Sequence, residues 1–479
     1  MKALNKTTAR KPVLPVKVLQ FGEGNFLRAF VDWMIDTANE RGILHHGVVI
    51  VQPIDKGMAG ALNRQDDLYH VYLEGIKDRE PVKETRLVTC VQDAVDPYAE
   101  YAKYEAYFLT PGLEIAISNT TEAGIRYEEG EDIFAEPPAS YPGKMTALLY
   151  KRFKHFNGAP ERGLTVICCE LIENNGSTLR EHVLRHARAH RLGDDFVRWV
   201  NDHCRFCDTL VDRIVTGFPR ENIDEIKAEL GYDDNLVVKA EYYHLWAIGG
   251  AAHEQARAAL PLDRAGLHVL YMPDIKAFRD KKVRVLNGSH TAMVPVGLQM
   301  GCETVMDAFK NPLVERYINT LVADEVLPMI DEERAGLDAF AAGILERFYN
   351  PYIRHALGAI SLNSLSKWEA RNFPTVLDNF EKAGKVATRS LFSLAALLVL
   401  YSGHAAVPFT PNDTPEHVAF IRQHWDNANV EQGVRKIIEN RQIWTAPLAS
   451  VPPLAPTVAA FAREILDEGM EQALVKLSR

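Results

Sequence analysis

The chain has 479 residues, which exceeds what one hydrophobic core usually supports and therefore predicts two domains. Its 47% hydrophobic and 25% charged residues are typical of an ordinary globular protein. The formal net charge of -10 argues against a nucleic-acid or anionic-membrane partner, because both favour basic surfaces. The longest apolar run, around Leu394–Tyr401, is too short to cross a bilayer, and six cysteines in so long a chain do not indicate a disulfide framework. We therefore expect a cytoplasmic protein with no membrane span.

The first half of the chain alternates short apolar runs with helical patterns. A strand is predicted at Val16–Phe21, followed by a glycine turn and an amphipathic helix that contains Phe26 and Phe30. Further buried strands are predicted at Gly47–Val51, Leu113–Ile117 and Leu164–Cys168, and the alternating stretch Tyr69–Thr89 allows a small antiparallel addition. Strands separated by helices predict parallel βαβ units, and hence an α/β Rossmann-type, doubly wound domain over residues 1–275.

The second half of the chain has a different pattern. After the last strand-like run, Leu267–Met272, periodic helical segments follow almost throughout, as in Leu313–Ile330, Leu337–Phe348 and Ser390–Tyr401. We expect residues 276–479 to form a mainly α-helical domain that holds the substrate and the catalytic groups.

The glycine turn after the first strand lies where a dinucleotide-binding fold places the cofactor phosphates. Gly22 permits a tight turn, and Gly24 lets the backbone approach a pyrophosphate at the helix N-terminus. Leu27 stands where the third glycine of the usual fingerprint would be, so an ordinary strand–helix turn is the alternative. The second strand has no acidic residue at its tip, and Asp55 comes slightly late in the sequence to contact the cofactor ribose. No arginine follows this strand at a position suited to binding the 2′-phosphate of NADP, and this absence favours NAD.

Polar residues near the ends of two later strands are further candidates for this site. Asn119 and Thr121 follow a predicted strand at its carboxyl end, where doubly wound folds bind ligands, although simple capping is the alternative. Asp212 and Arg213 are adjacent opposite charges that could form a buried pair.

The segment Lys281–His290 carries the residue types that carbonyl reduction needs. Lys282 can donate a proton if burial or a neighbouring cation lowers its pKa, and the candidate cations are Lys281, Arg284 and the nicotinamide of an oxidised cofactor. Asn287 can hydrogen-bond the developing alkoxide, and His290 can orient the substrate or the lysine. A bend at Gly288 would bring Lys282, Asn287 and His290 together. From spacing alone, a solvated basic helix is the competing interpretation.

Four segments then point to a family. They are Gly22-x-Gly24-Asn25-Phe26-x-Arg28-Ala29, Val211-Asp-Arg-Ile214, Lys282-x(4)-Asn287-x(2)-His290, and Arg347-Phe-x-Asn-Pro351 continuing to Ser366-Lys367. Together, in this order and over most of the chain, they resemble the polyol-specific long-chain dehydrogenases, which include mannitol dehydrogenase and the hexuronate reductases. The stretches Gln20–Trp33, Ser118–Gly124 and Thr209–Gly217 are more similar to the hexuronate-reducing members.

The resemblance implies a metal-free, NAD-dependent reaction. It implies that Lys282 is the general acid/base, with Asn287 and His290 on the substrate side, and that the turn with Asn25 and Phe26 binds the cofactor. It also suggests that Asp212 lies near the cofactor.

One departure from the family concerns the oxyanion site. Polyol members carry Cys-x-Asn-x(3)-Asn-Gly, whereas this chain reads Cys169-Glu-Leu-Ile-Glu-Asn-Asn-Gly176, with Leu171 in place of the first asparagine. Asn175 matches the end of the motif and is a candidate substrate contact, but Asn287 alone, Asn174 or Asn175 could each supply the oxyanion hydrogen bond.

A sugar acid also needs a cation to bind its carboxylate. Arg354, His355, Lys367 and Arg371 lie close in sequence. The resemblance favours Lys367, and we expect Arg354 and His355 to join it at the substrate. For the residues other than Lys367, a solvated charged face is the alternative.

These observations predict an enzyme that reduces a keto-hexuronate to its aldonate with NADH, reversibly. Alternatives with the same chemistry are a fructuronate reductase or a mannitol-type polyol 2-dehydrogenase, and an alternative of another class is a nicotinamide-binding sensor without turnover. The pair Cys204 and Cys207 resembles half a zinc site, but no second pair follows at matching spacing, and we expect the segment to be a packed helix.

Overall fold

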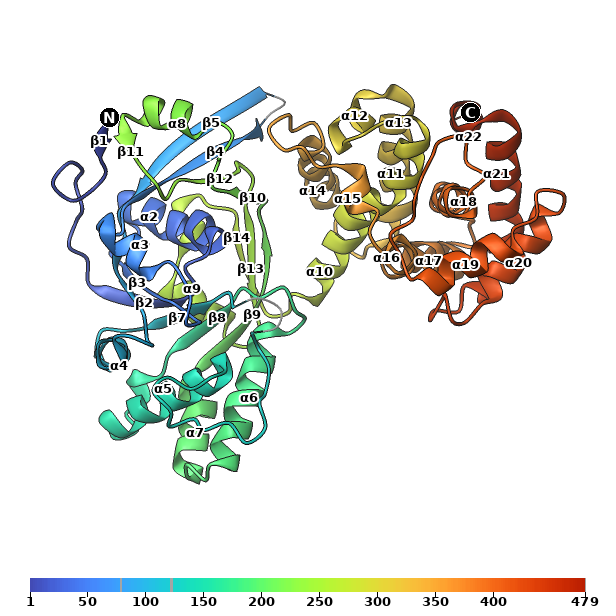
Figure 1. The fold of residues 1–479 in the computed structure, drawn as a ribbon. Helices are drawn as coiled ribbons and strands as arrows, with labels where there is room; N and C mark the ends of the chain where they lie inside the picture. The colour runs from blue at the N-terminus through green and yellow to red at the C-terminus, as the bar shows by residue number, and fades with distance from the viewer. Residues whose placement is uncertain (78–79, 121–123, 479) are drawn as a thin grey trace. The chain divides into compact units, whose positions relative to one another are not determined.

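The structure is a computed structural model that describes residues 1–77, 80–120 and 124–478, and it divides the chain into two compact units (Figure 1). The first unit contains Met1–Gly75 and Pro81–Lys276, and the second contains Ile76–Glu80 and Ala277–Arg479. The first unit is α/β and the second is helical, as the sequence predicted for the fold class.

The first unit is organised around an eight-stranded sheet within the described residues, in the order β14-β13-β9-β8-β7-β2-β3-β6. In that order the strands are Val269–Met272, Leu245–Gly249, Arg205–Asp212, Thr165–Cys168, Ile115–Ser118, Val16–Phe21, Gly47–Val51 and Val91–Val95. The strands from β6 to β9 are parallel, and β13 is antiparallel to β9. The strand order therefore reverses between β2 and β7, and ligands of doubly wound folds bind at such a point.

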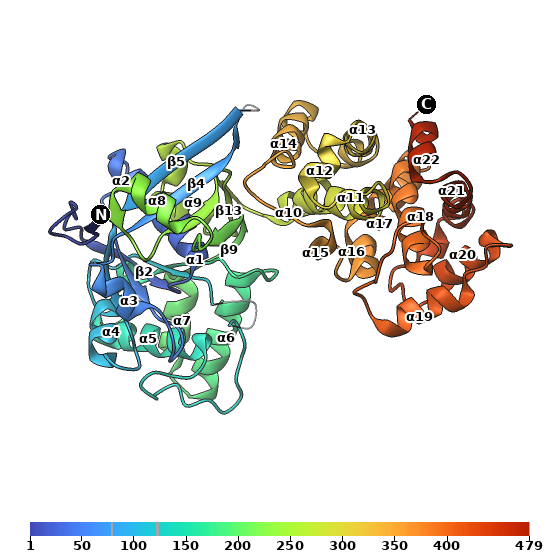
Figure 2. The same cartoon turned by 45° about the horizontal axis from the view of Figure 1, so that its top comes forward.

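Successive residues of a strand point to opposite faces of the sheet, and here both faces are apolar and form separate cores. Helices pack on both faces and cover these cores. Val18 of β2 belongs to one core and Leu19 to the other. One face is covered by α1 to α3 and α9, the other by α4 to α7 (Figures 1 and 2). The helical segments of this unit are α1 Asn25–Leu27, the π-helix η1 Arg28–Asp32, α2 Trp33–Glu40, α3 Ala59–Arg64, α4 Tyr101–Phe108, α5 Tyr141–His155, η2 Pro160–Arg162, α6 Asn175–Ala189, α7 Asp194–His203, α8 Ile223–Leu230, α9 His253–Ala259 and η3 Leu262–Ala265.

The strand-like stretch Tyr69–Thr89 contributes to a second, smaller sheet. Its order is β10-β12-β4-β5, with β4 Tyr69–Lys77, β5 Glu80–Val88, β10 Val215–Gly217 and β12 Val238–Glu241. The predicted antiparallel addition is in fact a mixed sheet, because β12 pairs with β4 in parallel. A further two-stranded pairing joins β1 Lys2–Ala3 to β11 Tyr232–Asp233.

The helix expected after Cys204 is wrong, since this segment is strand β9. It pairs with β8 on one side and β13 on the other, so sheet pairing overrides its helix-compatible pattern. Cys204 packs into one core and Cys207 into the other. The two thiols therefore lie on opposite faces of the sheet.

The second unit is helical in its described residues. Its segments are α10 Lys276–Lys282, the π-helix η4 Val283–Asn287, α11 Gly288–Gln299, α12 Val305–Lys310, α13 Pro312–Leu321, the π-helix η5 Val322–Val326, η6 Leu327–Met329, α14 Arg334–Arg347, α15 Leu357–Ile360, α16 Ser364–Arg371, α17 Phe373–Ala383, α18 Thr388–Ser402, α19 Pro415–His424, α20 Val430–Glu439, η7 Leu448–Ser450, α21 Leu454–Glu468 and α22 Met470–Leu477. The helix predicted at Ser390–Tyr401 is α18, and its apolar run is buried along its length within one large core. No helix among the described residues has the length and apolarity that crossing a membrane requires.

Candidate functional site

The glycine turn follows β2 directly at the point where the strand order reverses. Gly22 has φ +131°, and a Cβ built there would lie 3.0 Å from the carbonyl oxygen of Asn119 and 3.0 Å from Leu27 Cδ1. The Asn119 N–H in turn donates to the carbonyl of Phe21 at 3.0 Å. Backbone conformation and the close approach of the β7 end therefore both require glycine at position 22.

Gly24 leaves open space where a phosphate group would need it. It is exposed, its backbone is extended (φ −64°, ψ 163°), and a Cβ built there would meet no described atom within 4 Å. No side chain of the described residues caps the first turn of the helix that begins at Asn25, so its N–H groups remain available to an anion. These features fit the pyrophosphate of a dinucleotide. Beside the turn, Phe26 stacks on Phe30 with ring centroids 4.9 Å apart.

Arg28 holds the turn from within. Its buried guanidinium donates to the carbonyls of Glu23 (3.0 Å) and Leu236 (2.7 Å) and to Asn25 Oδ1 (2.8 Å). The cation also lies over the ring of Tyr69, 5.1 Å from its centroid. Arg28 is part of the turn motif, but no role was predicted for it from the sequence. A charged residue within an apolar helical face does indicate a specific buried partner.

A second buried network supports the same turn. Gln20 Nε2 donates to the carbonyl of Gly22 and to Asp32 Oδ2, both at 3.2 Å, and the Tyr69 hydroxyl donates to the same carboxylate oxygen at 2.7 Å. Burial raises the pKa of Asp32 to about 7, against the opposing hydrogen bonds from Tyr69 and Gln20. The sequence analysis missed both Gln20 and Asp32.

The carboxyl ends of β7 and β8 lie next to each other. Asn119 Nδ2 donates to the carbonyl of Cys169 at 3.2 Å, and Glu170 Oε1 accepts from the N–H (2.9 Å) and hydroxyl (3.0 Å) of Thr120. Burial raises the pKa of Glu170. Thr121, predicted to contact the cofactor, lies outside the described residues.

Asn175 is 1% exposed, and its amide is occupied by backbone groups. Nδ2 donates to the carbonyls of Cys168, Glu170 and Thr209, and Oδ1 accepts from the N–H groups of Gly176 and Thr209. The side chain thereby ties the end of β8 to β9 and to the start of α6. Its predicted contact with substrate stays a prediction.

Asp212 and Arg213 are both buried at the end of β9. The Arg213 guanidinium donates to four backbone carbonyls and lies 4.2 Å from the Trp33 ring centroid; the carbonyls belong to Ala29, Glu241, Tyr242 and Tyr243. Burial lowers the pKa of Arg213 to about 9. Arg213 thus links η1, whose helix begins at the glycine turn, to the segment between β12 and β13.

The six cysteines are unpaired and mostly buried. All six are free thiols, and burial raises the pKa values of Cys204 and Cys207 to about 12. Across the described ranges, no three His, Cys, Asp or Glu side chains gather closely enough to hold a metal ion.

In the second unit, the predicted catalytic segment spans a break in helical geometry. Lys282 ends α10, the π-helix η4 covers Val283–Asn287, and α11 begins at Gly288. The bend expected at Gly288 is wrong, since its φ of −63° and ψ of −44° are helical, and the irregularity lies in the π-turn before it. π-turns inside helices often mark functional sites, because the wider turn redirects side chains.

Lys282, Asn287 and His290 are each partly exposed. Asn287 Oδ1 is buried and accepts no hydrogen bond from the described residues, so this oxygen is open to a donor group of a ligand. His290 lies beside His355 (ring centroids 5.1 Å apart) and Phe348 (4.5 Å). The structure therefore brings His355, a predicted substrate residue, next to His290 of the catalytic segment. Burial lowers the pKa of His355.

The two cations expected to act on Lys282 are ion-paired instead. Lys281 Nζ lies 2.6 Å from Glu332 Oε2, and Arg284 pairs with Asp378. Because a carboxylate offsets each charge, neither residue is the cationic neighbour that the sequence analysis expected.

The other predicted substrate cations lie in different surroundings. The Arg354 side chain is 81% exposed and lies 3.2 Å from Glu303, whereas Lys367 Nζ donates to the carbonyl of Ile360 at 2.9 Å. Burial, and secondly the neighbouring Arg371, lower the pKa of Lys367.

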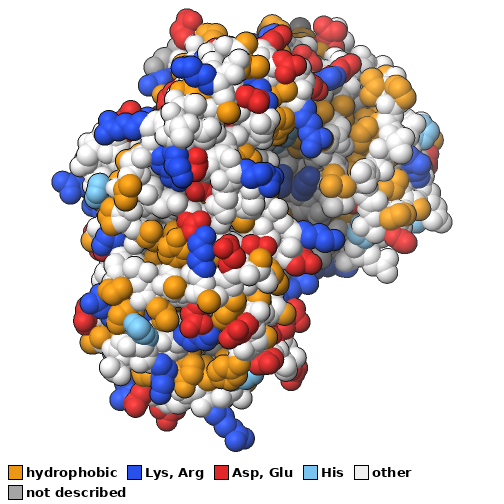
Figure 3. Space-filling view, turned by 60° about the vertical axis from the view of Figure 1, so that its left-hand side comes forward, with side chains coloured by type: hydrophobic (Ala, Val, Ile, Leu, Met, Phe, Trp, Pro, Cys, Tyr) orange, Lys and Arg blue, Asp and Glu red, His pale blue; other side chains and the backbone are white. Residues whose placement is uncertain are grey.

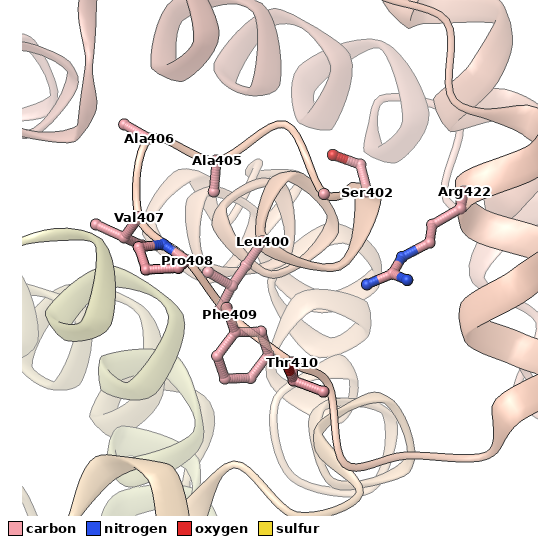
Figure 4. A pocket seen from close by; sticks show the side chains of 10 residues that line it. Leu400, Ser402, Ala405, Ala406, Val407, Pro408, Phe409, Thr410 and Arg422 are labelled. Carbon is pink, nitrogen blue, oxygen red and sulfur yellow. The ribbon is translucent and has the colours of Figure 1, made fainter.

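A pocket of about 570 Å³ lies elsewhere in the second unit, beyond the end of α18 (Figure 4). It is lined by residues such as Leu400, Phe409 and the exposed Arg422, and by none of the predicted site residues. On the face that Figure 3 shows, Lys and Arg side chains are interspersed with Asp and Glu, without a continuous basic surface in the part described.

Comparison with known families gives two matches that together cover most of the chain. Residues 16–262 match the mannitol dehydrogenase Rossmann domain, and residues 274–466 match the mannitol dehydrogenase C-terminal domain. The altronate oxidoreductase of Bacillus subtilis (strain 168) is 41% identical over 462 residues, which are 96% of this chain and 95% of the relative. The altronate oxidoreductase of Escherichia coli O6:K15:H31 is 38% identical, with 99% of each chain covered.

Solved structures share the fold at lower identity. A D-sorbitol dehydrogenase in substrate-free form superposes with a TM-score of 0.80 at 20% identity, covering 99% of this chain and all of that one. The mannitol 2-dehydrogenase of Pseudomonas fluorescens, solved with NAD and D-mannitol, gives a TM-score of 0.66 at 21% identity, covering 99% and 96%.

Proposed function

The chain belongs to the mannitol dehydrogenase family, as an NAD-dependent oxidoreductase of CH–OH groups, and we propose that it reduces tagaturonate to altronate reversibly. The observation that carries this proposal is the near-40% identity to altronate oxidoreductases over almost the whole chain. The polyol dehydrogenases of similar fold are only about 20% identical, so they support the fold and not the substrate.

The first unit would hold the cofactor. Gly22 and Gly24 would receive the pyrophosphate, with Asn25, Phe26 and Asn119 around it, because the open first turn of the helix and the glycine conformations fit that group. NAD(H), when bound, supplies or accepts the hydride in the reaction.

Glu23 supports the preference for NAD. A Cβ built at Gly57, in the loop after β3, would lie 2.2 Å from Glu23 Oε1, so this carboxylate occupies the loop where dinucleotide folds bind the ribose. A carboxylate can accept a hydrogen bond from a ribose hydroxyl, but it repels a 2′-phosphate. A dinucleotide fold is expected to have an acidic residue at the β3 tip; in this proposal the carboxylate would come from Glu23 of the glycine turn instead.

The second unit would perform the proton chemistry. In reduction, the Lys282 ammonium donates a proton to the substrate oxygen as the ketone becomes an alcohol, and in oxidation the neutral amine removes it. Asn287 Nδ2 donates a hydrogen bond to that oxygen, and its buried, unpartnered Oδ1 is left to accept one from a neighbouring substrate hydroxyl. His290, beside His355, orients the hydroxyl groups next to the reacting carbon.

The substrate assignment is tested by NADH oxidation with tagaturonate, fructuronate and fructose offered separately. We expect tagaturonate to give a kcat/KM at least ~100-fold above the other two, since a pocket built to hydrogen-bond specific hydroxyls rejects a wrong stereoisomer strongly. Comparable turnover of fructuronate or fructose would instead identify one of the rival substrates.

The role of Lys282 is tested with Lys282→Ala and Lys282→Arg. Both should lower kcat by roughly 10²–10⁴-fold with NADH binding retained, because arginine keeps the charge but releases no proton near neutral pH. If both variants keep the wild-type kcat, Lys282 is not the acid/base. If the wild type turns over no hexuronate or polyol yet binds NADH, the sensor alternative gains support.

A further inference from the structure

Arg371, at the end of α16, is a partly buried cation without a carboxylate partner in the described part of the chain. One N–H of its guanidinium donates to the Thr291 hydroxyl, with Nη1 and Oγ1 3.2 Å apart. A guanidinium carries five N–H donors, so most of this donor set is left for a ligand. Burial lowers the pKa of Arg371, and no acidic side chain among the residues that the structure describes offsets that effect.

Two contacts fix Arg371 against the catalytic segment. Thr291 Oγ1, which accepts from Arg371, donates to the carbonyl of Asn287 at 2.9 Å. The next residue, Asn372, donates from Nδ2 to the carbonyl of Gly288 at 3.1 Å and is itself buried. The end of α16 is therefore attached to the first turn of α11, which also carries His290.

The surroundings make this cation different from its neighbours. Lys281 and Arg284, on the same catalytic segment, are both paired with carboxylates. Lys367, one turn before Arg371 on α16, has no ion pair with a described residue either, and Asp413 is the acidic group that contributes most to its electrostatics. Two partly buried cations one turn apart repel each other, and an anionic ligand between them would offset that repulsion.

We propose that Arg371 binds the carboxylate of the sugar-acid substrate, with Lys367 as a second cation beside it. This inference rests on the proposed function. It identifies the side chain that recognises the carboxylate, which sugar acids have and neutral polyols lack. A hexuronate carries its carboxylate several bonds from its ketone, so the anchor need not touch Asn287 itself, and Thr291 links Arg371 to the Asn287 backbone carbonyl. Arginine suits the task because its planar fork matches a carboxylate in a bidentate pair.

The test measures binding of altronate and of altritol, which has CH₂OH in place of the carboxylate, by calorimetry in the presence of NADH. Wild type, Arg371→Ala, Arg371→Lys and a matched surface control, Arg435→Ala, are compared. Arg435 is an exposed side chain of α20 whose ion-pair partner, Glu431, is not one of the predicted site residues. Wild type should bind altronate more tightly than altritol. Arg371→Ala should weaken altronate binding roughly 10- to 100-fold, the range for a charged hydrogen-bonded pair, and change altritol binding less than about twofold.

Two further readouts separate an anchoring role from a structural one. Arg371→Lys should recover part of the affinity, and added guanidinium should partly restore the KM of Arg371→Ala for tagaturonate. Equal loss of altronate and altritol binding, or no loss of either, would overturn the inference. A wild type that binds altronate through Arg371 but does not turn over tagaturonate would refute the proposed function alone, and tagaturonate turnover insensitive to Arg371→Ala would refute the anchor alone.

Discussion

Substitution of the two turn glycines separates backbone strain from cofactor binding. Gly22→Ala puts a side chain at φ +131°, which costs about 1–3 kcal/mol, and its Cβ at 3.0 Å from the Asn119 carbonyl oxygen forces the β7 end to shift. We expect a total loss of about 2–4 kcal/mol in the free energy of unfolding of the first unit. Gly24→Ala meets neither obstacle, because φ is −64° and the space is open, so its stability should change by less than about 0.5 kcal/mol.

The two variants should nevertheless both bind NADH more weakly. In Gly24→Ala the added methyl group occupies space that the pyrophosphate needs, and we expect at least a roughly 10-fold higher Kd by fluorescence titration, with an unchanged melting temperature. Gly42→Ala is a control for strain alone, because Gly42 has φ +68° and no described atom within 4 Å of a built Cβ. Wild-type NADH affinity in Gly24→Ala would refute the placement of the cofactor at this turn.

The remaining predictions concern two buried residues of the first unit. The folded-state pKa of Asp32, about 7, is raised above its ordinary 3.8, so the unfavourable effect of this carboxyl grows as the pH rises through that interval. The stability of Asp32→Asn relative to wild type should therefore increase by about 2–3 kcal/mol between about pH 5 and pH 7, as measured by urea unfolding at each pH, and a pH-independent difference would contradict this account. Asn175→Ala should lower the free energy of unfolding by about 3–5 kcal/mol, because it removes the acceptor of two buried N–H groups, those of Gly176 and Thr209, and the donor to the carbonyls that Nδ2 contacts. A loss of catalysis at wild-type stability would instead favour the predicted substrate contact.

The sequence predicted the elements that local pattern determines. The strands β2 and β3 and the buried helix α18 occur where apolar periodicity placed them. Strand β9 was missed because its pairing with β8 and β13 depends on residues distant in sequence, which no local pattern reports.

A site residue could be predicted from the sequence when its role follows from its residue type and its distance in sequence from a strand or helix end. Gly22 and Gly24 are such cases, since their backbone conformations follow from the turn. The roles of Arg28, Asp32 and Arg371 depend on tertiary partners, namely Leu236, Tyr69 and Thr291. Ion pairing likewise could not be read from sequence, because Glu332 lies far along the chain from Lys281.

The proposed reaction is tested most directly in the direction of oxidation. Purified protein is given NAD with altronate, mannonate or mannitol, and NADH formation is followed by absorbance. The account predicts rapid NADH formation with altronate, at a rate at least ~100-fold above those with mannonate and mannitol, and loss of that rate in Lys282→Ala. Faster oxidation of mannonate or mannitol than of altronate would contradict the proposed substrate.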